Sequence, residues 1–261
     1  MFTIGCDPEL FLKKGDDFVC AWGLIPGDKK NPHPVEGGSV QVDGFAVEFN
    51  TPPVKNEDEF VMSVNKLIQE LYKLCPGYSI EATPVAEFSM EYIKSQPEEA
   101  KELGCDPDYN AWEDGQIFPK PNGEVPFRTG AGHFHIGWTE NETPEDPDHF
   151  ARCIQLTKQL DFFLGLPSVI LDKDKKRREM YGKAGCFRPK PYGVEYRTLS
   201  NFWVDNEKVQ RLLFKNIHKA IELLMEGEHL YLKGDIQDVI NNSDEEKALW
   251  LCNKYGINYE V

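Results

Sequence analysis

The segment Gly193–Leu199 holds the residues whose types and spacing point most directly to chemistry. It reads Gly-Val-Glu-Tyr-Arg-Thr-Leu. In a β-strand successive side chains point to opposite faces, so Glu195 and Arg197 would share one face. A carboxylate binds divalent cations, and a guanidinium pairs with phosphate oxygens. The segment therefore predicts one wall of a site that holds a metal ion and a phosphate side by side.

Three further segments with strand character also place strong ligands two residues apart. They carry Asp7 and Glu9, Glu48 and Asn50, and His133 and His135. Each pair alone is more often exposed or hydrogen-bonded than functional. The histidines, however, lie in Gly130–Gly137, where small residues let a bulky ligand approach the backbone. Glu48 lies between two large apolar residues that would anchor its strand in a core.

If these four faces converge, the site offers several carboxylate oxygens, one or two imidazoles and nearby cations. Hard oxygen ligands favour Mg²⁺ or Mn²⁺, whereas zinc sites favour closely spaced Cys and His, an arrangement that the sequence lacks. Such a metal bridges phosphate oxygens, and the cations neutralise the charge that builds during phosphoryl transfer. The pattern therefore suits a bound nucleoside triphosphate.

Basic residues crowd one segment of an otherwise acidic chain. The 261 residues carry a formal net charge of −15 and a sequence pI near 4.9, which argues against direct nucleic-acid binding as the main task. The clustered cations are Lys173, Lys175, Lys176, Arg177, Arg178, Lys183, Arg188 and Lys190. The cluster is either a solvated loop or a phosphate-binding surface.

Several common catalytic patterns are missing from the sequence. We find no GxxxxGK[ST] loop, no GxGxxG motif that opens a helix, no GxSxG elbow and no credible cysteine nucleophile. The seven cysteines are odd in number and never form CxxC, which predicts reduced thiols. Neither an export signal nor an apolar run near 18 residues is present, so we expect a cytoplasmic protein without a membrane span.

Hydrophobic periodicity predicts clustered strands followed by amphipathic helices. We expect strands over residues 2–13, 18–24, 39–50, 80–88 and 128–139, helices over 56–75, 90–103, 149–164 and 206–225, and a last helix from a capping box at 243–246 to Gly256. Residues 104–126 are mostly loop. Because strands and helices do not alternate, the pattern favours an α+β fold with an antiparallel or mixed sheet and helices against one side.

Six blocks in order along residues 2–204 resemble the phage-type carboxylate-amine ligases, the amidoligase type 2 group. The blocks are Gly5–Phe11, Asp43–Pro53, Gly104–Trp112, Arg128–Gly137, Arg177–Gly185 and Gly193–Trp203. That group is similar to the glutamine synthetase and glutamate-cysteine ligase superfamily. The resemblance implies a curved, mainly antiparallel sheet flanked by helices, as in the glutamine synthetase catalytic domain. It implies one ligase domain over residues 1–261 with a helical C-terminal part at 205–261, in the host cytoplasm if phage-encoded.

The resemblance also implies an activity. ATP would phosphorylate a carboxylate with the help of two or three Mg²⁺ or Mn²⁺ ions, and an amine would attack the acyl phosphate to give an amide. The substrates would be a small-molecule or peptide carboxylate and amine. Their identity and the oligomeric state stay open, and the loop at 104–126 is one place where substrate choice could reside.

Residue roles follow from the same resemblance. Glu9, Glu48, Glu195 and His133 match metal ligands, and His133, His135, Lys183 and Arg197 match nucleotide-binding positions. Arg177, Arg178, Arg188 and Arg197 lie where catalytic cations contact phosphate or acyl phosphate. The chain departs from the family at Asp7-Pro8-Glu9, where the superfamily often has Glu-x-Glu, so Asp7 either ligates metal or shapes the turn.

Three alternatives compete with a ligase. The His133 and His135 pair with the carboxylates could serve a metal-dependent hydrolase, although this leaves Arg197 little to do. The chain could also be a nucleotide-binding module without turnover. In a third view the polar residues of a soluble sheet-and-helix domain simply satisfy one another.

Overall fold

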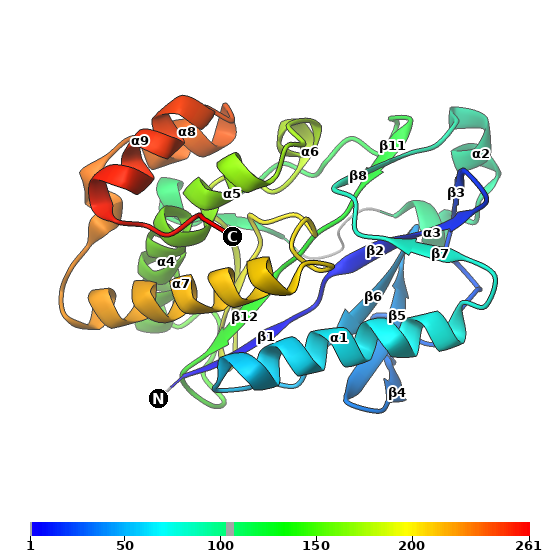
Figure 1. Ribbon diagram of the computed structural model, residues 1–261, viewed down its shortest axis with the longest axis horizontal. Coiled ribbons are helices and arrows are strands. Elements are labelled where there is room, and N and C mark those ends of the chain that lie inside the picture. Colours follow the sequence, from blue (N-terminus) through cyan, green and yellow to red (C-terminus); the bar gives the residue numbers. More distant parts are fainter. Residues whose placement is uncertain (1, 103–106) are drawn as a thin grey trace.

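The computed structural model describes residues 2–102 and 107–261, and two sheets dominate it (Figure 1). The first has the strand order β1 (Thr3–Cys6), β12 (Phe134–Gly137), β14 (Gly193–Tyr196), β13 (Cys186–Lys190), β9 (Tyr109–Asn110) and β10 (Gln116–Ile117). The second has the order β3 (Asp17–Val19), β2 (Glu9–Lys14), β6 (Ala46–Asn50), β5 (Gly38–Asp43) and β4 (His33–Val35), with β7 (Ser79–Glu81) on β2. A ribbon of β8 (Val85–Glu87) and β11 (Phe127–Thr129) completes the strands of the described residues.

All pairings between the described strands are antiparallel. The expected α+β class with antiparallel sheets and helices is therefore confirmed. The strands form two sheets, however, instead of one continuous curved sheet. The strand expected over residues 2–13 breaks between Cys6 and Glu9, because Pro8 has no N–H to donate to a ladder. Its first half joins one sheet and its second half joins the other.

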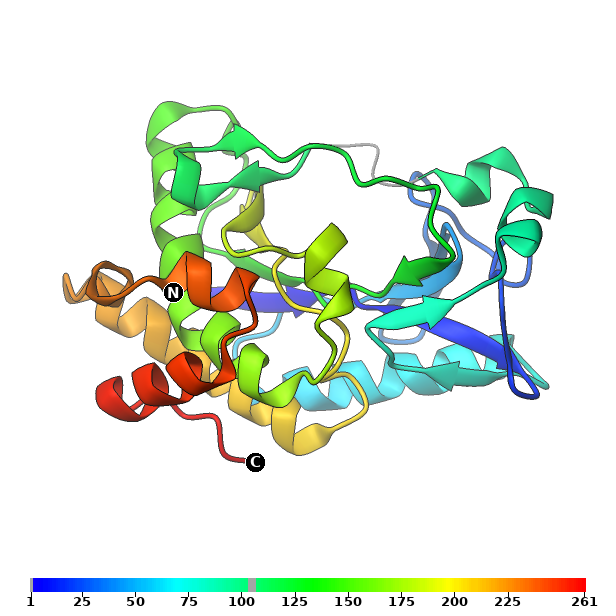
Figure 2. The same cartoon turned by 90° about the horizontal axis from the view of Figure 1, so that it is seen from above.

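The main helices are α1 (Glu57–Leu74), α4 (Pro147–Leu160), α5 (Leu166–Leu171), α7 (Glu207–Met225), α8 (Ile236–Asn241) and α9 (Glu245–Tyr255), with a π-helical turn η2 (Asp161–Gly165) between α4 and α5. Helix α1 packs on β5 and β6 and α4 packs on β13 and β14, whereas α5, α8 and α9 pack mainly on other helical segments. The short helices are α2 (Met90–Ser95), α3 (Glu98–Lys101) and α6 (Lys176–Met180), and the 3₁₀ turns are Ala111–Glu113 and Leu230–Lys233. Seen from above, α1 and α7 lie on one side of β1 and β2, and α6 and the β9–β10 segment lie on the other (Figure 2).

The helix-facing side of the first sheet is apolar. The register aligns Cys6, Phe134, Tyr196 and Phe187 in one row, and Ile4, Ile136, Val194 and Pro189 in the next. These side chains are buried, and Phe134 packs on Phe60 of α1 and on Trp203, with ring centroids 5.7 and 4.8 Å apart. Burial of this face supplies the hydrophobic free energy that fixes the strand register.

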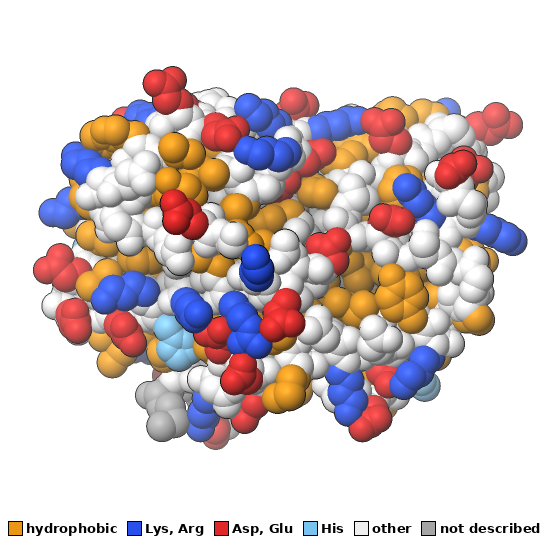
Figure 3. Space-filling view, viewed as in Figure 1, with side chains coloured by type: hydrophobic (Ala, Val, Ile, Leu, Met, Phe, Trp, Pro, Cys, Tyr) orange, Lys and Arg blue, Asp and Glu red, His pale blue; other side chains and the backbone are white. Residues whose placement is uncertain are grey.

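The outer surface of α1 and α7 is a mixed ionic surface. Arg211 pairs with Glu57 at 2.9 Å, with Asp58 at 2.7 Å and with Glu207 at 2.8 Å, and acidic and basic side chains are interspersed over this face (Figure 3). No described helix is long and apolar enough to cross a membrane.

Most predicted helix boundaries are confirmed. Asn56 caps α1 by accepting from Glu59 N, Asn206 caps α7, and α9 ends at left-handed Gly256. The polar helix expected over residues 90–103 is divided in two, because α2 ends at Ser95 and α3 begins at Glu98, directly after Pro97. Residues 103–106 lie outside the described part of the chain. The expected strand over residues 128–139 is also interrupted, between β11 and β12.

The capping box expected at Ser243 was placed one residue too early. Asp244 caps α9, with its side chain accepting from Lys247 N. Ser243 has a φ of 50° and its hydroxyl is 3.3 Å from Arg178 Nη1. The Ser243 hydroxyl thus faces Arg178, and the side-chain cap of α9 comes from Asp244.

Candidate active site

The second face of the first sheet carries several side chains that the sequence predicts to form a site. Its register aligns Gly5, His135, Glu195 and Arg188 in one row across β1, β12, β14 and β13. Residues directly opposite one another in a ladder point to the same face. His135, Glu195 and Arg188 therefore project to one side, away from the apolar rows that pack on the helices.

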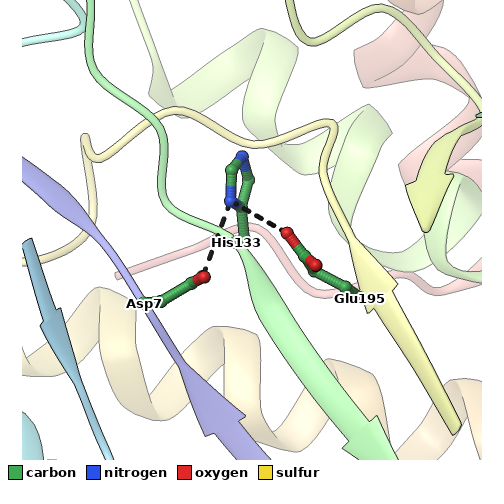
Figure 4. A group of neighbouring side chains, drawn as sticks. All are labelled: Asp7, His133 and Glu195. Carbon is green, nitrogen blue, oxygen red and sulfur yellow. Dashed lines mark ion pairs between the residues drawn. The ribbon is translucent and has the colours of Figure 1, made fainter. Parts of the chain in front are cut away.

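A first group of metal-type ligands lies at the end of this face. Asp7, His133 and Glu195 each offer one ligand atom, and these atoms all lie within 4.8 Å of one another. His133 Nδ1 is 3.5 Å from Asp7 Oδ1 and 3.5 Å from Glu195 Oε1. The three side chains come from neighbouring chain segments and point toward a common centre (Figure 4). Asp7 thus lies within a group that could hold a metal ion, and its part in metal binding stays a prediction.

The protonation states of this group suit a cation. Burial and the charge of Arg197 hold the pKa of His133 well below its ordinary value, so the imidazole is neutral and one ring nitrogen keeps a lone pair. Burial alone would raise the pKa of Asp7, but His135 and His133 hold it well below its ordinary value. A neutral imidazole and carboxylate oxygens form a donor set that could hold a divalent metal ion.

Arg197 follows β14 and crosses the group. Its Nε is 2.7 Å from Asp108 Oδ1, its Nη1 is 3.1 Å from His133 Nδ1, and it also contacts Glu195 and Tyr181. It is 9% exposed. The shared face predicted for Glu195 and Arg197 is confirmed by their direct contact.

A second group of carboxylates lies on the second sheet. Glu9, Asp43 and Glu48 bring one oxygen each within 4.8 Å of the others. Glu9 and Glu48 are directly opposite in the β2–β6 register. Lys29 Nζ is 2.9 Å from Asp43 Oδ2, and Ala131 N donates to Glu9 Oε2 at 3.0 Å.

These carboxylates repel one another where water is scarce. Burial and Asp43 raise the pKa of Glu9 to about 7, although Ala131 N–H, Lys29 and Arg197 lower it in part. Burial and the charges of Asp7, Asp43 and Glu9 raise the pKa of Glu48 well above its ordinary value. One lysine does not balance three acids. An oxygen-rich donor set of this kind fits a divalent cation.

Two cavities flank the groups. The first, of about 280 Å³, is lined by Glu9, Asp43 and Arg197 together with Lys29, Lys183, Arg128 and the aromatic residues Phe11 and Phe45. The second, of about 660 Å³, is lined by residues that include Gly5, Gly137, His135, Trp138 and Tyr192. Asp7 links the two sides, because its Oδ1 is 3.0 Å from His135 Nε2 and 3.5 Å from His133 Nδ1.

The predicted cations are divided by the fold. Lys183 lines the first cavity, and Lys190 Nζ and Arg188 Nη1 lie 2.8 and 3.7 Å from Glu195 Oε2. Arg177 instead donates to the carbonyls of Thr198 and Leu199 at 2.9 and 2.8 Å.

Arg178 also points away from the ligand groups. Its guanidinium donates to Ser168 Oγ at 3.0 Å and to Ser243 Oγ at 3.3 Å. The structure thus gives Arg177 and Arg178 structural contacts, and their assignment as catalytic cations remains a prediction.

Sequence reasoning gave no role to five residues at the site: Lys29, Asp43, Asp108, Arg128 and Tyr181. Asp43 and Arg128 stood inside the motif blocks, but neither alternates with another ligand on its strand. The block Gly104–Trp112 was noted, yet Asp108 became identifiable only through its contacts with Arg197 and Arg188. The earlier part of that block lies outside the described residues.

Comparison with known proteins gives a match to a family model and loose likenesses to solved structures. Residues 127–235, less than half of the chain, match the family described as "Phage phiEco32-like COOH.NH2 ligase-type 2". This range contains His133, Glu195 and Arg197. The match is thus to a ligase family, as the motif blocks predicted, over this part of the chain. No match was found among curated proteins.

Among solved structures, the chain is similar to a bifunctional glutathione synthetase from Pasteurella multocida, with 13% sequence identity and a TM-score of 0.42. The similarity covers 98% of this chain and 45% of that one. The chain thus spans less than half the length of this structural relative.

Proposed function

We propose that this protein is an ATP-dependent carboxylate-amine ligase that works with Mg²⁺ or Mn²⁺ and forms an amide through an acyl phosphate. The observation that carries the proposal is the pair of adjacent ligand groups, Asp7/His133/Glu195 and Glu9/Asp43/Glu48, with Arg197 beside both. The match of residues 127–235 to a ligase family supports it.

The second cavity suits the nucleotide. Trp138 and Tyr192 line it and offer aromatic faces on which a base can stack. From there the row through His135 leads to Glu195, where Lys190 and Arg188 gather. These cations would hold the phosphates, and the terminal phosphate would arrive beside Arg197.

The first cavity suits the acid substrate. It is lined by Arg197 and Glu9, so a carboxylate bound there would lie beside the two ligand groups. Divalent cations held by the two groups would neutralise phosphate charge and polarise the bond that breaks. Arg197 would stabilise charge on the transferred phosphoryl oxygens, and Asp108 and Tyr181 hold its guanidinium in place.

The test measures ADP release with pooled carboxylates and amines, with product mass read from the same reaction. We expect ADP and amide only when both substrates and Mg²⁺ or Mn²⁺ are present. Glu195→Gln and Arg197→Ala should each lower turnover by at least about a hundredfold. Arg152→Gln is the control, because Arg152 is half exposed and pairs only with Glu142, at 3.6 Å, among the described residues.

Two outcomes would contradict the ligase. Amide or phosphoester hydrolysis without nucleotide would favour a metal-dependent hydrolase built on the His133 and His135 pair. Tight binding of nucleotide with Mg²⁺, but no turnover on any substrate pair, would identify a binding module. Folded variants of Glu195 and Arg197 that keep full ADP release would exclude the proposed roles.

A further inference from the structure

Tyr181 is the residue through which the motif block Arg177–Gly185 contacts the first ligand group. It directly follows α6, and its N–H donates to Arg177 O at 2.8 Å. Its ring packs against two buried guanidiniums, with their central carbons 5.1 Å (Arg177) and 5.6 Å (Arg197) from the ring centroid. Cation–π contacts of this kind help to fix the ring, and with it the hydroxyl.

The guanidinium of Arg177 is itself fixed by the backbone. Its Nη1 and Nη2 donate to the carbonyls of Thr198 and Leu199 at 2.9 and 2.8 Å. Gly182 has a φ of 72° and lies so close to this guanidinium that a Cβ on it would overlap the group. The residues on either side of Tyr181 in space and in sequence therefore leave its ring little freedom to move.

The hydroxyl of Tyr181 contacts two functional side chains at once. It accepts from Arg197 Nη2, and it lies 3.3 Å from His133 Nε2. The first contact orients the guanidinium. The second has a separate consequence, because the neutral imidazole of His133 carries one proton that can reside on either ring nitrogen.

The neighbours of His133 decide which nitrogen carries that proton. Arg197 Nη1 lies 3.1 Å from His133 Nδ1, and a guanidinium offers hydrogens but no lone pair. Nδ1 is therefore the acceptor, and the proton is on Nε2, which donates to Tyr181 OH. Asp7 Oδ1 and Glu195 Oε1 are each 3.5 Å from Nδ1, beyond the usual N–H···O range of about 2.7–3.2 Å.

We infer that Tyr181 is a positioning residue that holds His133 in the Nε2–H tautomer, so that the Nδ1 lone pair faces Asp7 and Glu195 (Figure 4). The inference rests on the proposed function, in which this group holds a divalent cation. A histidine that binds a metal usually donates from its other ring nitrogen to a fixed partner, and loss of such a partner weakens metal binding by about 10–100-fold.

Tyr181→Phe separates the hydroxyl from the ring. The phenylalanine keeps the ring that packs against Arg177 and Arg197, and it removes the acceptor of His133 Nε2–H. A buried donor without an acceptor costs free energy. The other tautomer, in which Nδ1–H points toward Asp7 Oδ1, should therefore gain population, and it has no lone pair for a cation in this group.

The experiment reads the tautomer in metal-free protein near neutral pH. Histidine is labelled with ¹⁵N, because NMR distinguishes a ring nitrogen that carries a proton from one with a lone pair. A spectrum of His133→Gln identifies the signals of His133. The proteins compared are the wild type, Tyr181→Phe and the control Tyr72→Phe, which changes an exposed tyrosine on α1. Mn²⁺ affinity is measured by calorimetry without nucleotide, and folding is checked by the thermal midpoint.

We expect His133 of the wild type and of Tyr72→Phe to carry its proton on Nε2. In Tyr181→Phe the two ¹⁵N shifts of His133 should move toward each other, and Mn²⁺ affinity should fall about tenfold or more. A tyrosine that served only packing would change the thermal midpoint and leave the ring shifts and the Mn²⁺ affinity as they are.

Three results would overturn the inference. They are a wild-type His133 with its proton on Nδ1, wild-type ring shifts in folded Tyr181→Phe, and unchanged Mn²⁺ affinity in that variant. The wild-type spectrum tests the tautomer even if the variant does not fold. A tautomer and an Mn²⁺ affinity that both depend on Tyr181, in a protein without any ligase turnover, would keep this role and refute the proposed reaction.

Discussion

Glu9 and Glu48 stand directly opposite each other on β2 and β6, and Asp43 completes the group from β5. Antiparallel pairing thus forces carboxylates together on one buried face, and like charges opposite each other destabilise a sheet. The sheet tolerates this arrangement only if protons or cations neutralise it.

Glu48→Gln tests whether the Glu9, Asp43 and Glu48 group binds a divalent cation. Removing one oxygen ligand should weaken Mn²⁺ binding by at least about tenfold, measured by calorimetry without nucleotide. The metal-free variant should be as stable as the wild type or more so, because the repulsion falls. Glu246→Gln, an exposed change on α9, is the control. Unchanged Mn²⁺ affinity in Glu48→Gln would remove Glu48 from the ligands.

The pH dependence of stability tests the raised pKa of Glu9. A folded-state pKa near 7, above the ordinary value of 4.5, means that the folded protein binds the proton more tightly than the unfolded chain. The stability from this group is complete below pH 4.5 and is lost as pH rises through 7. We therefore expect the free energy of unfolding of Glu9→Gln, measured with a metal chelator present, to rise relative to that of the wild type as the pH increases from 4.5 to 7. The difference should reach up to about 3 kcal/mol.

Comparing two proteins isolates Glu9 from other titrating groups. The lowered pKa of His133, for example, makes stability fall as pH drops below 6.5, and this effect is present in both proteins. Glu87→Gln changes an exposed glutamate that pairs with Lys176, and its profile of unfolding free energy against pH should be parallel to that of the wild type. Parallel profiles for Glu9→Gln as well would refute the raised pKa.

Asp161→Asn should destabilise the fold and loosen the site. The buried carboxylate accepts from Trp112 Nε1 and Gly185 N at 2.6 Å each, from Tyr196 OH at 2.8 Å and from Thr198 Oγ1 at 3.2 Å. An amide would turn an NH₂ group toward one pair of these donors. We expect a loss of about 2–4 kcal/mol in urea unfolding.

The control for that change is Asp148→Asn, at an exposed residue in the first turn of α4. It should cost less than about 0.5 kcal/mol. Similar unfolding midpoints for the two variants would show that the four contacts to Asp161 contribute little.

Gly132→Ala and Gly5→Ala form a matched pair beside the ligands. A Cβ on Gly132 would lie 2.3 Å from Ser200 O and 2.5 Å from Trp203 Nε1, whereas on Gly5 its nearest neighbours would be Thr51 O at 3.4 Å and Thr51 Oγ1 at 3.5 Å. Gly132→Ala should lower the free energy of unfolding by about 1–3 kcal/mol or more, and Gly5→Ala should lower it by under about 1 kcal/mol. Equal thermal midpoints would show that the backbone near Gly132 adjusts freely.

Local patterns predicted the elements better than their assembly. Side-chain alternation identified the ligand-bearing strands, and Asn56 and Asn206 marked helix starts, because both signals act over a few residues. Pro8 removes one backbone donor from its strand, but the separation of β1 and β2 into different sheets depends on long-range pairing. The spacing of residue types within a short segment carries no information about such pairing.

The site was predictable where ligands repeat every second residue. Asp43 and Arg128 lack that repeat, and their places at the site emerge from contacts between segments far apart in the chain. Arg178 illustrates the converse. A dense run of cations suggested phosphate, but this guanidinium is directed by two serine hydroxyls into the helical layer. A charge cluster in sequence does not show which way each side chain turns.

The chain segment at Pro8 joins the two ligand groups covalently and so limits the distance between them. Asp7 belongs to one group and Glu9 to the other, so a single dipeptide step connects them. Two residues of extended chain span about 7 Å. The spacing between two bound cations would then be set mainly by bond lengths and angles, and it would survive small shifts of one sheet against the other.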